Sequence, residues 1–96
     1  MKRAEILETA KVCVCGKREQ DYGSPEDNFQ IIADLWSVYL GDKLDQQLCA
    51  VGVAMMMALL KIARIKSGTG TDDSFVDLAG YAACGGEISE NYRKEM

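Results

Sequence analysis

Residues 48–60 read LCAVGVAMMMALL, thirteen residues without a charged side chain. The run is too short to cross a membrane as a helix, which takes about 20 apolar residues. It shows no alternation of polar and apolar residues, so we expect a helix that is apolar on nearly every side and buried on most of them. We expect Asp45 to cap this helix, which continues to about Lys66 with Gly68 just beyond. Such a helix is either the centre of the fold or the seam of an oligomer.

Two further helices are expected before this run. The first extends from about Arg3 to Val14, where apolar residues recur at helical spacing and Gly16 is a natural stop. The second is capped by Ser24, has Pro25 in its first turn and ends at Gly41. One apolar stripe of this helix is expected to face the core, and it consists of Phe29, Ile32, Ala33, Trp36, Tyr39 and Leu40.

The last helix is expected to begin after Thr71. Asp72 and Asp73 then lie in its first turn, where negative charge is favoured by the helix dipole. The helix passes a weak point at Gly85–Gly86 before a charged tail. The sequence therefore predicts an all-α fold, a compact bundle of about four helices that forms a single domain over residues 1–96.

Composition restricts the partners and the compartment. With 48% hydrophobic and 27% charged residues the chain is not of disordered composition, and its net charge of −4 argues against binding duplex nucleic acid. Glu5 and Glu8 interrupt any apolar signal-peptide region, so we expect a cytoplasmic protein without a membrane partner. The four cysteines occur without any histidine, and the spacing of Cys13 and Cys15 favours free thiols over a metal site.

Charged residues near the end of the third helix suggest a binding site. Lys61 and Arg64 are three residues apart and share a helix face. Because this helix is largely apolar, its charges need partners, and Asp73 and Asp77 on the next helix are candidates. The pattern indicates an internal salt-bridge network, a pocket for an anionic ligand, or both.

A polar loop between the first two helices adds possible ligand contacts. Arg18 offers a planar fork for phosphate, Tyr22 offers a ring and a hydroxyl, and Gly23 permits a turn. Asn28 follows in the first turn of the next helix, where its amide can contact a base or ribose or simply start the helix.

Tyr81 lies one turn after Asp77 on the face expected to carry the acidic residues. Its neighbour Gly80 permits close approach by a ligand or by another helix. Trp36, by contrast, falls on the core stripe and is expected to pack there.

Three stretches of this sequence resemble motifs shared by small phage and prophage proteins. They are residues 18–29 (REQDYGSPEDNF), 60–64 (LKIAR) and 72–81 (DDSFVDLAGY). That family is in turn distantly similar to the MazG-like all-α nucleoside triphosphate pyrophosphohydrolases. The resemblance implies a helical bundle that is commonly oligomeric and that binds Mg²⁺ through one Glu-x-x-Glu and one Glu-x-x-Asp motif.

This sequence departs from the enzyme pattern at both motifs. Ser74 and Asp77 stand where Glu-x-x-Asp is expected, with Asp73 as a possible substitute one position earlier. Lys61 and Arg64 are the polar pair found in place of Glu-x-x-Glu. Since Mg²⁺ needs hard oxygen ligands, two cations in place of two carboxylates favour phosphate binding without metal.

The combined expectation is a cytoplasmic protein of a bacterial host that sequesters a phosphate-bearing nucleotide without hydrolysing it. A cyclic or ADP-ribose-type immune signal of the host would suit such a phage anti-defence role. No cofactor, metal ligand or catalytic residue is assigned, and a homo-oligomer, dimer or higher, is expected. The ligand-binding residues expected are Arg18, Tyr22, Asn28, Lys61, Arg64, Asp73, Asp77 and Tyr81.

Two alternatives remain open from the sequence. One is a Mg²⁺-dependent nucleoside triphosphate pyrophosphohydrolase in which Asp21, Asp73 and Asp77 gather the metal ion. The other is a structural or regulatory interaction protein whose Met-rich third helix is an oligomer seam.

Overall fold

The computed structural model describes residues 1–16 and 23–95, and these form helices without any strand. The elements are α1 (Arg3–Cys15), α3 (Pro25–Leu40), the short 3-10 helix η1 (Gly41–Lys43), α4 (Ala50–Lys66) and α5 (Asp72–Glu95). The expected all-α bundle of about four helices is therefore confirmed. Among the described helices, none is long and apolar enough to span a lipid bilayer.

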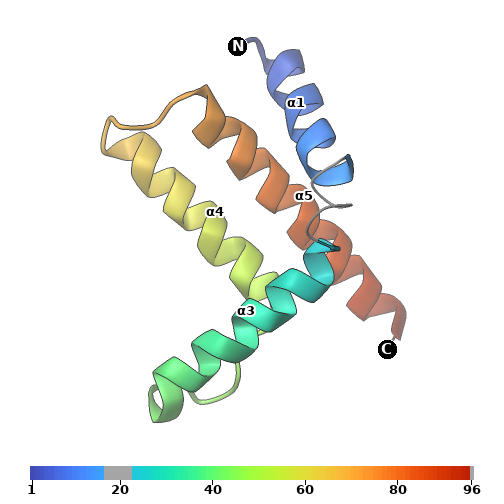
Figure 1. The fold of residues 1–96 in the computed structure, drawn as a ribbon, viewed down its shortest axis with the longest axis vertical. Helices are drawn as coiled ribbons and strands as arrows, with labels where there is room; N and C mark the ends of the chain where they lie inside the picture. The colour runs from blue at the N-terminus through green and yellow to red at the C-terminus, as the bar shows by residue number, and fades with distance from the viewer. Residues whose placement is uncertain (17–22, 96) are drawn as a thin grey trace.

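The two longest helices, α4 and α5, form an antiparallel hairpin at the centre of the fold (Figure 1). The first helix, α1, packs on the side of α5 that faces away from α4. The remaining helix, α3, crosses the beginning of α4, and its second half projects beyond the hairpin. Helix α5 therefore has α1 on one side and α4 on the other, whereas the second half of α3 extends beyond these helices.

The local signals at the ends of α1 and α3 produce the boundaries expected from them. Gly16 follows α1, and the Ser24 hydroxyl accepts a hydrogen bond of 3.3 Å from the Asp27 N–H at the start of α3. Gly41 ends α3 with a φ of 56°, a left-handed conformation that favours glycine.

The expected start of α4 is wrong by several residues. Asp45 does not cap this helix, which begins at Ala50 with Cys49 as its cap; the Cys49 sulfur accepts the Gly52 N–H at 3.4 Å. The reason is a tertiary contact, because the Leu48 N–H donates to the Ser37 hydroxyl of α3 at 2.9 Å. That bond holds the segment before Cys49 against α3 outside the helix.

Small side chains allow α4 and α5 to approach closely. Ala50, Val53, Ala54 and Ala58 are buried on α4, and they share the core with buried Val76, Cys84 and Ile88 of α5. Gly85 is buried opposite Ala54, where a β-carbon on the glycine would lie 3.3 Å from the alanine β-carbon. The helix continues through Gly85 and Gly86 without a break.

Two expectations about burial differ from the structure. Tyr39 is 89% exposed, so its placement on the core stripe of α3 is wrong; it lies on the projecting half of the helix, away from the buried Ala33 and Ser37. On α4, one face is buried, whereas Met55, Met56, Leu59, Leu60 and Ile62 are exposed. The single chain therefore does not bury α4 on most sides.

Candidate functional site

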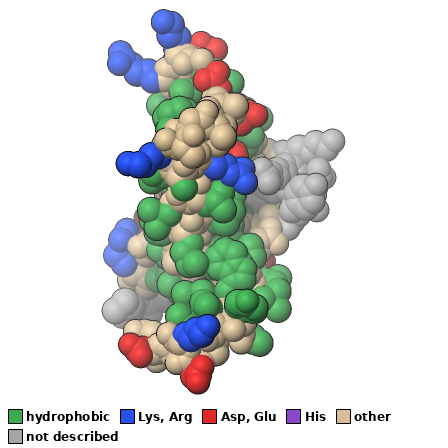
Figure 2. Space-filling view, turned by 90° about the vertical axis from the view of Figure 1, so that its left-hand side faces the viewer, with side chains coloured by type: hydrophobic (Ala, Val, Ile, Leu, Met, Phe, Trp, Pro, Cys, Tyr) green, Lys and Arg blue, Asp and Glu red, His purple; other side chains and the backbone are tan. Residues whose placement is uncertain are grey.

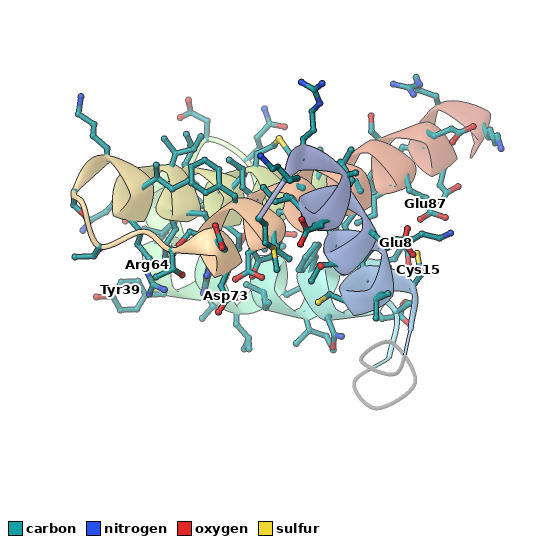
Figure 3. All side chains as sticks on the ribbon, turned by 90° about the horizontal axis from the view of Figure 1, so that it is seen from above. Glu8, Cys15, Tyr39, Arg64, Asp73 and Glu87 are labelled. Atoms are coloured by element: carbon teal, nitrogen blue, oxygen red, sulfur yellow. The ribbon has the colours of Figure 1, made fainter. Side chains whose placement is uncertain are left out.

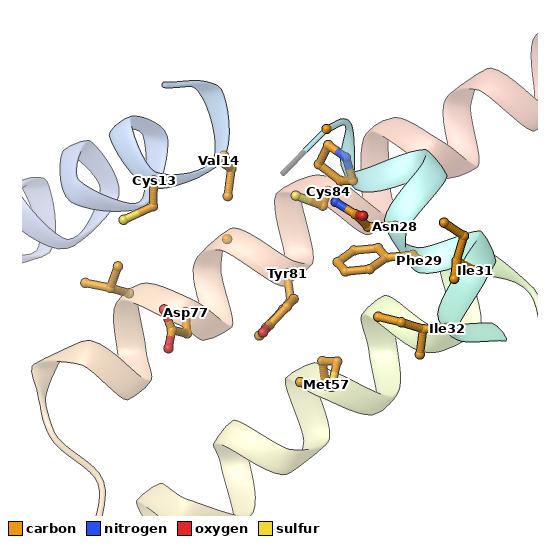
Figure 4. A pocket seen from close by; sticks show the side chains of 14 residues that line it. Cys13, Val14, Asn28, Phe29, Ile31, Ile32, Met57, Asp77, Tyr81 and Cys84 are labelled. Carbon is orange, nitrogen blue, oxygen red and sulfur yellow. The ribbon is translucent and has the colours of Figure 1, made fainter. Parts of the chain in front are cut away.

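A cavity of about 570 Å³ lies where α1, α3, α4 and α5 meet (Figure 4). Its walls are mainly apolar and include Val14 from α1, Phe29 and Ile32 from α3, and Met57 from α4. The polar side chains among the described lining residues are Asn28, Asp77, Tyr81 and the thiols of Cys13 and Cys84. Small-molecule sites have this size and this mixture of an apolar wall and a few polar groups.

Helical spacing on α5 brings three of these groups to the cavity. Asp77, Tyr81 and Cys84 are related as i, i+4 and i+7, so they form one stripe of the helix. Gly80 is buried beside them, and a β-carbon there would lie 3.1 Å from Cγ1 of Val14. The close packing of α1 against α5 therefore explains why position 80 is a glycine. Gly80 also lines the cavity.

Two aromatic rings face each other across the α3–α5 junction. The ring centroids of Phe29 and Tyr81 lie 6.1 Å apart, with the planes tilted by 41°. Tilted pairs at this distance are favourable because the positive edge of one ring approaches the negative face of the other. The pair gives the cavity an aromatic wall (Figure 4).

An ion pair lies at the α4–α5 side of the cavity. The Lys61 ammonium nitrogen is 2.9 Å from Oδ2 of Asp77, and their side chains are 13% and 33% exposed. The salt bridge expected for Lys61 is thus present, with Asp77 as its partner. It fixes one cation next to the cavity wall.

The structure brings together only part of the expected set of site residues. Asn28, Asp77 and Tyr81 line the cavity, and Lys61 adjoins it through Asp77. Arg64 and Asp73 are exposed near the α4–α5 turn, outside the lining (Figure 3).

Three residues expected from the sequence belong to the segment between α1 and α3. Arg18 and Tyr22, and Asp21 of the alternative metal site, lie outside the described residues.

Several wall residues were not expected from the sequence. The sequence places Phe29 on the core stripe and Met57 in the apolar run 48–60, and periodicity does not reveal where such a stripe borders a cavity. Cys84 carried a usable signal, since its spacing from Asp77 and Tyr81 places it on their stripe. Beside the cavity a smaller hollow of about 280 Å³ shares Val14 and Cys84 with it and is bordered by Glu26 and Glu87.

The donor atoms near the cavity are not arranged as a metal site. Within residues 1–16 and 23–95, no group of three or more His, Cys, Asp or Glu side chains gathers where an ion could be held. The four cysteines belong to this described part of the chain and form no disulfide with one another.

Comparison with models of known protein families identifies one that matches this chain. Residues 5–89 match the model of a family described as a domain of unknown function, DUF6378. The chain belongs to this family. The DUF6378 match thus covers all but the first four and the last seven residues of this sequence.

The similar curated proteins come from mycobacteriophages. Over 86 residues the chain is 46% identical to the Gene 55 protein of Mycobacterium phage D29, covering 88% of this chain and 54% of that protein. Over 77 residues it is 44% identical to the Gene 55 protein of Mycobacterium phage L5, covering 80% and 47%. This DUF6378 chain therefore spans about half the length of these relatives. No solved structure matches it significantly. The resemblance to small phage proteins is confirmed, and the similarity to MazG-like enzymes stays a prediction.

Proposed function

We propose that this chain binds and holds a phosphate-bearing nucleotide in the cavity without hydrolysing it. The observation that carries the proposal is the Lys61–Asp77 ion pair beside an aromatic wall. A nucleotide combines a flat ring system with an anionic phosphate, and the cavity offers an aromatic surface together with the Lys61 cation, which adjoins the lining carboxylate of Asp77. Its volume of about 570 Å³ is suitable for a ligand of this size.

The aromatic side of the cavity would receive the base. Tyr81 and Phe29 present ring surfaces, and stacking on such rings tolerates different bases. The side-chain amide of Asn28 both donates and accepts hydrogen bonds, as base edges require. This arrangement favours a base in the apolar part of the cavity.

The ion pair would receive the phosphate. A lysine ammonium has three donors, so Lys61 can keep its contact with Asp77 and still donate to a phosphate oxygen. The same contact favours binding over turnover. Magnesium is held through carboxylates, and the Asp77 carboxylate already faces an ammonium group.

The proposal includes a biological role and an evolutionary origin. A phage protein that retains a nucleotide signal of its bacterial host would weaken the response that the signal triggers, and the similar proteins are phage proteins. A MazG-like ancestor that lost its magnesium carboxylates is consistent with the all-helical fold and with Lys61 in place of a carboxylate.

A thermal-shift screen tests the proposal. The panel contains ATP, GTP, ADP-ribose and cyclic dinucleotides, each with Mg²⁺ or with EDTA. The bound compound is then recovered and identified by mass spectrometry. We expect at least one compound to raise Tm equally in EDTA and to return intact. Absence of any shift across the panel would overturn nucleotide binding. Product formation that requires Mg²⁺ and is lost in Asp77→Asn would establish the pyrophosphohydrolase instead.

Two lysines of α4 provide a matched pair of variants. Lys61→Met removes the cation beside the cavity but keeps the apolar stem, whereas Lys66→Met makes the same change at an exposed position. We expect Lys61→Met to lower the affinity for a nucleotide at least tenfold in calorimetric titration, and to leave the affinity for the matching nucleoside unchanged. Lys66→Met should bind normally, and equal losses in both variants would contradict a phosphate contact at Lys61.

A further inference from the structure

The outer face of α4 carries a second apolar stripe besides the one in the core. Met55, Leu59 and Ile62 follow one another at helical spacing and are exposed, with Met56 beside them. Figure 2 shows hydrophobic side chains running down this face, with Lys and Arg side chains towards its edges. A continuous stripe of this kind on one helix is typical of a contact surface.

The projecting helix α3 carries a matching stripe. Ile31, Leu35 and Val38 have the same i, i+4, i+7 spacing and are all exposed, and Tyr39 adjoins them. The second half of α3 extends past the hairpin (Figure 1), and the exposed stripe lies on the side of this helix away from the buried Ala33 and Ser37. Both apolar stripes are therefore left in water by the single chain.

The chain exposes far more surface than a compact monomer of its mass. Its solvent-accessible area is 7044 Å², whereas the scaling for monomers predicts about 5,400 Å² for 10.5 kDa. Its radius of gyration is 14.3 Å, against about 12.5 Å expected for this length. The excess of about 1,600 Å² is larger than the roughly 800 Å² that each partner buries in an interface of standard size.

We propose that a second copy of this chain covers these stripes, with α3 of each copy packed across the outer face of α4 of the other. A two-fold axis makes this arrangement closed, since each copy contributes one α3 and one α4 to the interface. The apolar composition of both stripes is that of an obligate interface.

Charge supports a second copy as the occupant. The acidic residues of α3 are Glu26, Asp27 and Asp34, and this helix has no basic residue. The exposed basic residues of α4 are Arg64 and Lys66, since Lys61 is paired with Asp77 of the same chain, and this helix has no acidic residue. Crossing α3 of one copy over α4 of the other thus places opposite charges on the two sides of the apolar contact.

The interface would reach the cavity. Ile31 begins the stripe of α3 and also lines the cavity. A second copy on this stripe therefore covers that side of the cavity. The proposal itself does not depend on nucleotide binding, because the oligomeric state is measured without ligand.

Sedimentation equilibrium of the unliganded chain, from micromolar to hundred-micromolar concentration, tests the dimer. We expect a mass of twice 10.5 kDa. A chain that stays monomeric over this range overturns the proposal and leaves the stripes to another partner or to a longer form of the protein.

Three leucines of nearly equal exposure locate the interface. Leu59 and Leu35 are 62% and 64% exposed on the two stripes, and Leu7 is 64% exposed on α1. We expect Leu59→Glu and Leu35→Glu each to weaken the dimer by about a hundredfold or more, since a charge is placed in an apolar contact. Leu7→Glu should leave the dimer unchanged. Equal weakening by Leu7→Glu would contradict the assigned surface.

Charge reversal gives a second test with variants that keep the apolar stripes intact. Replacing Arg64 and Lys66 together by Glu should weaken the dimer about tenfold, because these residues would then repel the acidic α3 of the partner. Replacing Lys2 and Arg3 together by Glu makes the same charge change on the other side of α5. If both double variants weaken the dimer equally, the effect is one of net charge, and the α3–α4 pairing is wrong.

Discussion

The ammonium group of Lys61 and the carboxylate of Asp77 meet at 2.9 Å and tie the end of α4 to the second turn of α5. Both side chains are partly withdrawn from water, so each is the main compensation for the other's burial. The pair is thus a structural contact of the hairpin as well as the charged part of the candidate site.

Coupling between these residues is expected in a double-mutant cycle. Lys61→Met and Asp77→Asn should each lower the free energy of unfolding by about 1–2 kcal/mol, because each leaves a partly buried charge without its partner. The double variant should lose about 1 kcal/mol less than the sum. Urea unfolding at one fixed protein concentration measures the cycle, and strictly additive losses would show that the contact contributes nothing.

The hydrogen bond from Leu48 to Ser37 should have a measurable effect on stability. Ser37→Ala removes the acceptor for a partly buried N–H, which should cost about 1–2 kcal/mol. Ser89→Ala is the control, since the Ser89 hydroxyl accepts a hydrogen bond from the exposed Arg93 side chain in the same helix. The Tm of both variants is measured by thermal unfolding. Equal Tm values would argue that water replaces the Ser37 hydroxyl as acceptor for the Leu48 N–H without loss of stability.

Two glycines of α5 should respond differently to alanine. Gly86 has nothing within 4 Å of the position of a β-carbon, so Gly86→Ala should stabilise the helix by about 0.5–1 kcal/mol. At Gly80 the new β-carbon would lie 3.1 Å from a methyl of Val14, and strain against α1 should cancel or reverse the gain. Differential scanning calorimetry should therefore rank Gly86→Ala above the natural chain and Gly80→Ala at or below it.

Tyr81 should act in the proposed binding through its ring. Tyr81→Phe keeps the contact with Phe29 and should leave the nucleotide affinity within about threefold. Tyr81→Ala removes a stacking surface and should weaken binding by about tenfold to a hundredfold. Isothermal titration calorimetry measures the nucleotide affinity of both variants. A large loss of affinity in Tyr81→Phe would show that the hydroxyl, rather than the ring, contacts the ligand.

Local sequence signals were sufficient for most of the fold. Ser24 and Pro25 start α3, and glycines at 16 and 41 follow or end helices, because caps act through neighbouring residues alone. The start of α4 differs from the expected one because it depends on the contact of Leu48 with Ser37, which lies eleven residues before Leu48 and on another helix. The exposure of Tyr39 was missed because its helix projects beyond the hairpin.

The candidate site could be predicted only in part for a similar reason. Periodicity indicates which residues share a helix face, and it relates Asp77 to Tyr81; the Lys61–Asp77 pair follows instead from the need of a charge on an apolar helix for a partner. It does not indicate how far along the helix a cavity extends. Arg64 and Asp73 have suitable chemistry but lie near the turn of the hairpin, outside the lining of the cavity.

The attachment of α1 has a consequence for how a ligand and the fold influence each other. Ala10 is the one buried residue of this helix, so undocking α1 from α5 should require less free energy than unfolding the hairpin, and the amide hydrogens of α1 should exchange first. Yet Cys13 and Val14 of α1 form one wall of the cavity. A molecule that contacts this wall must by linkage slow amide exchange in α1, and its measured affinity includes the cost of keeping that helix docked.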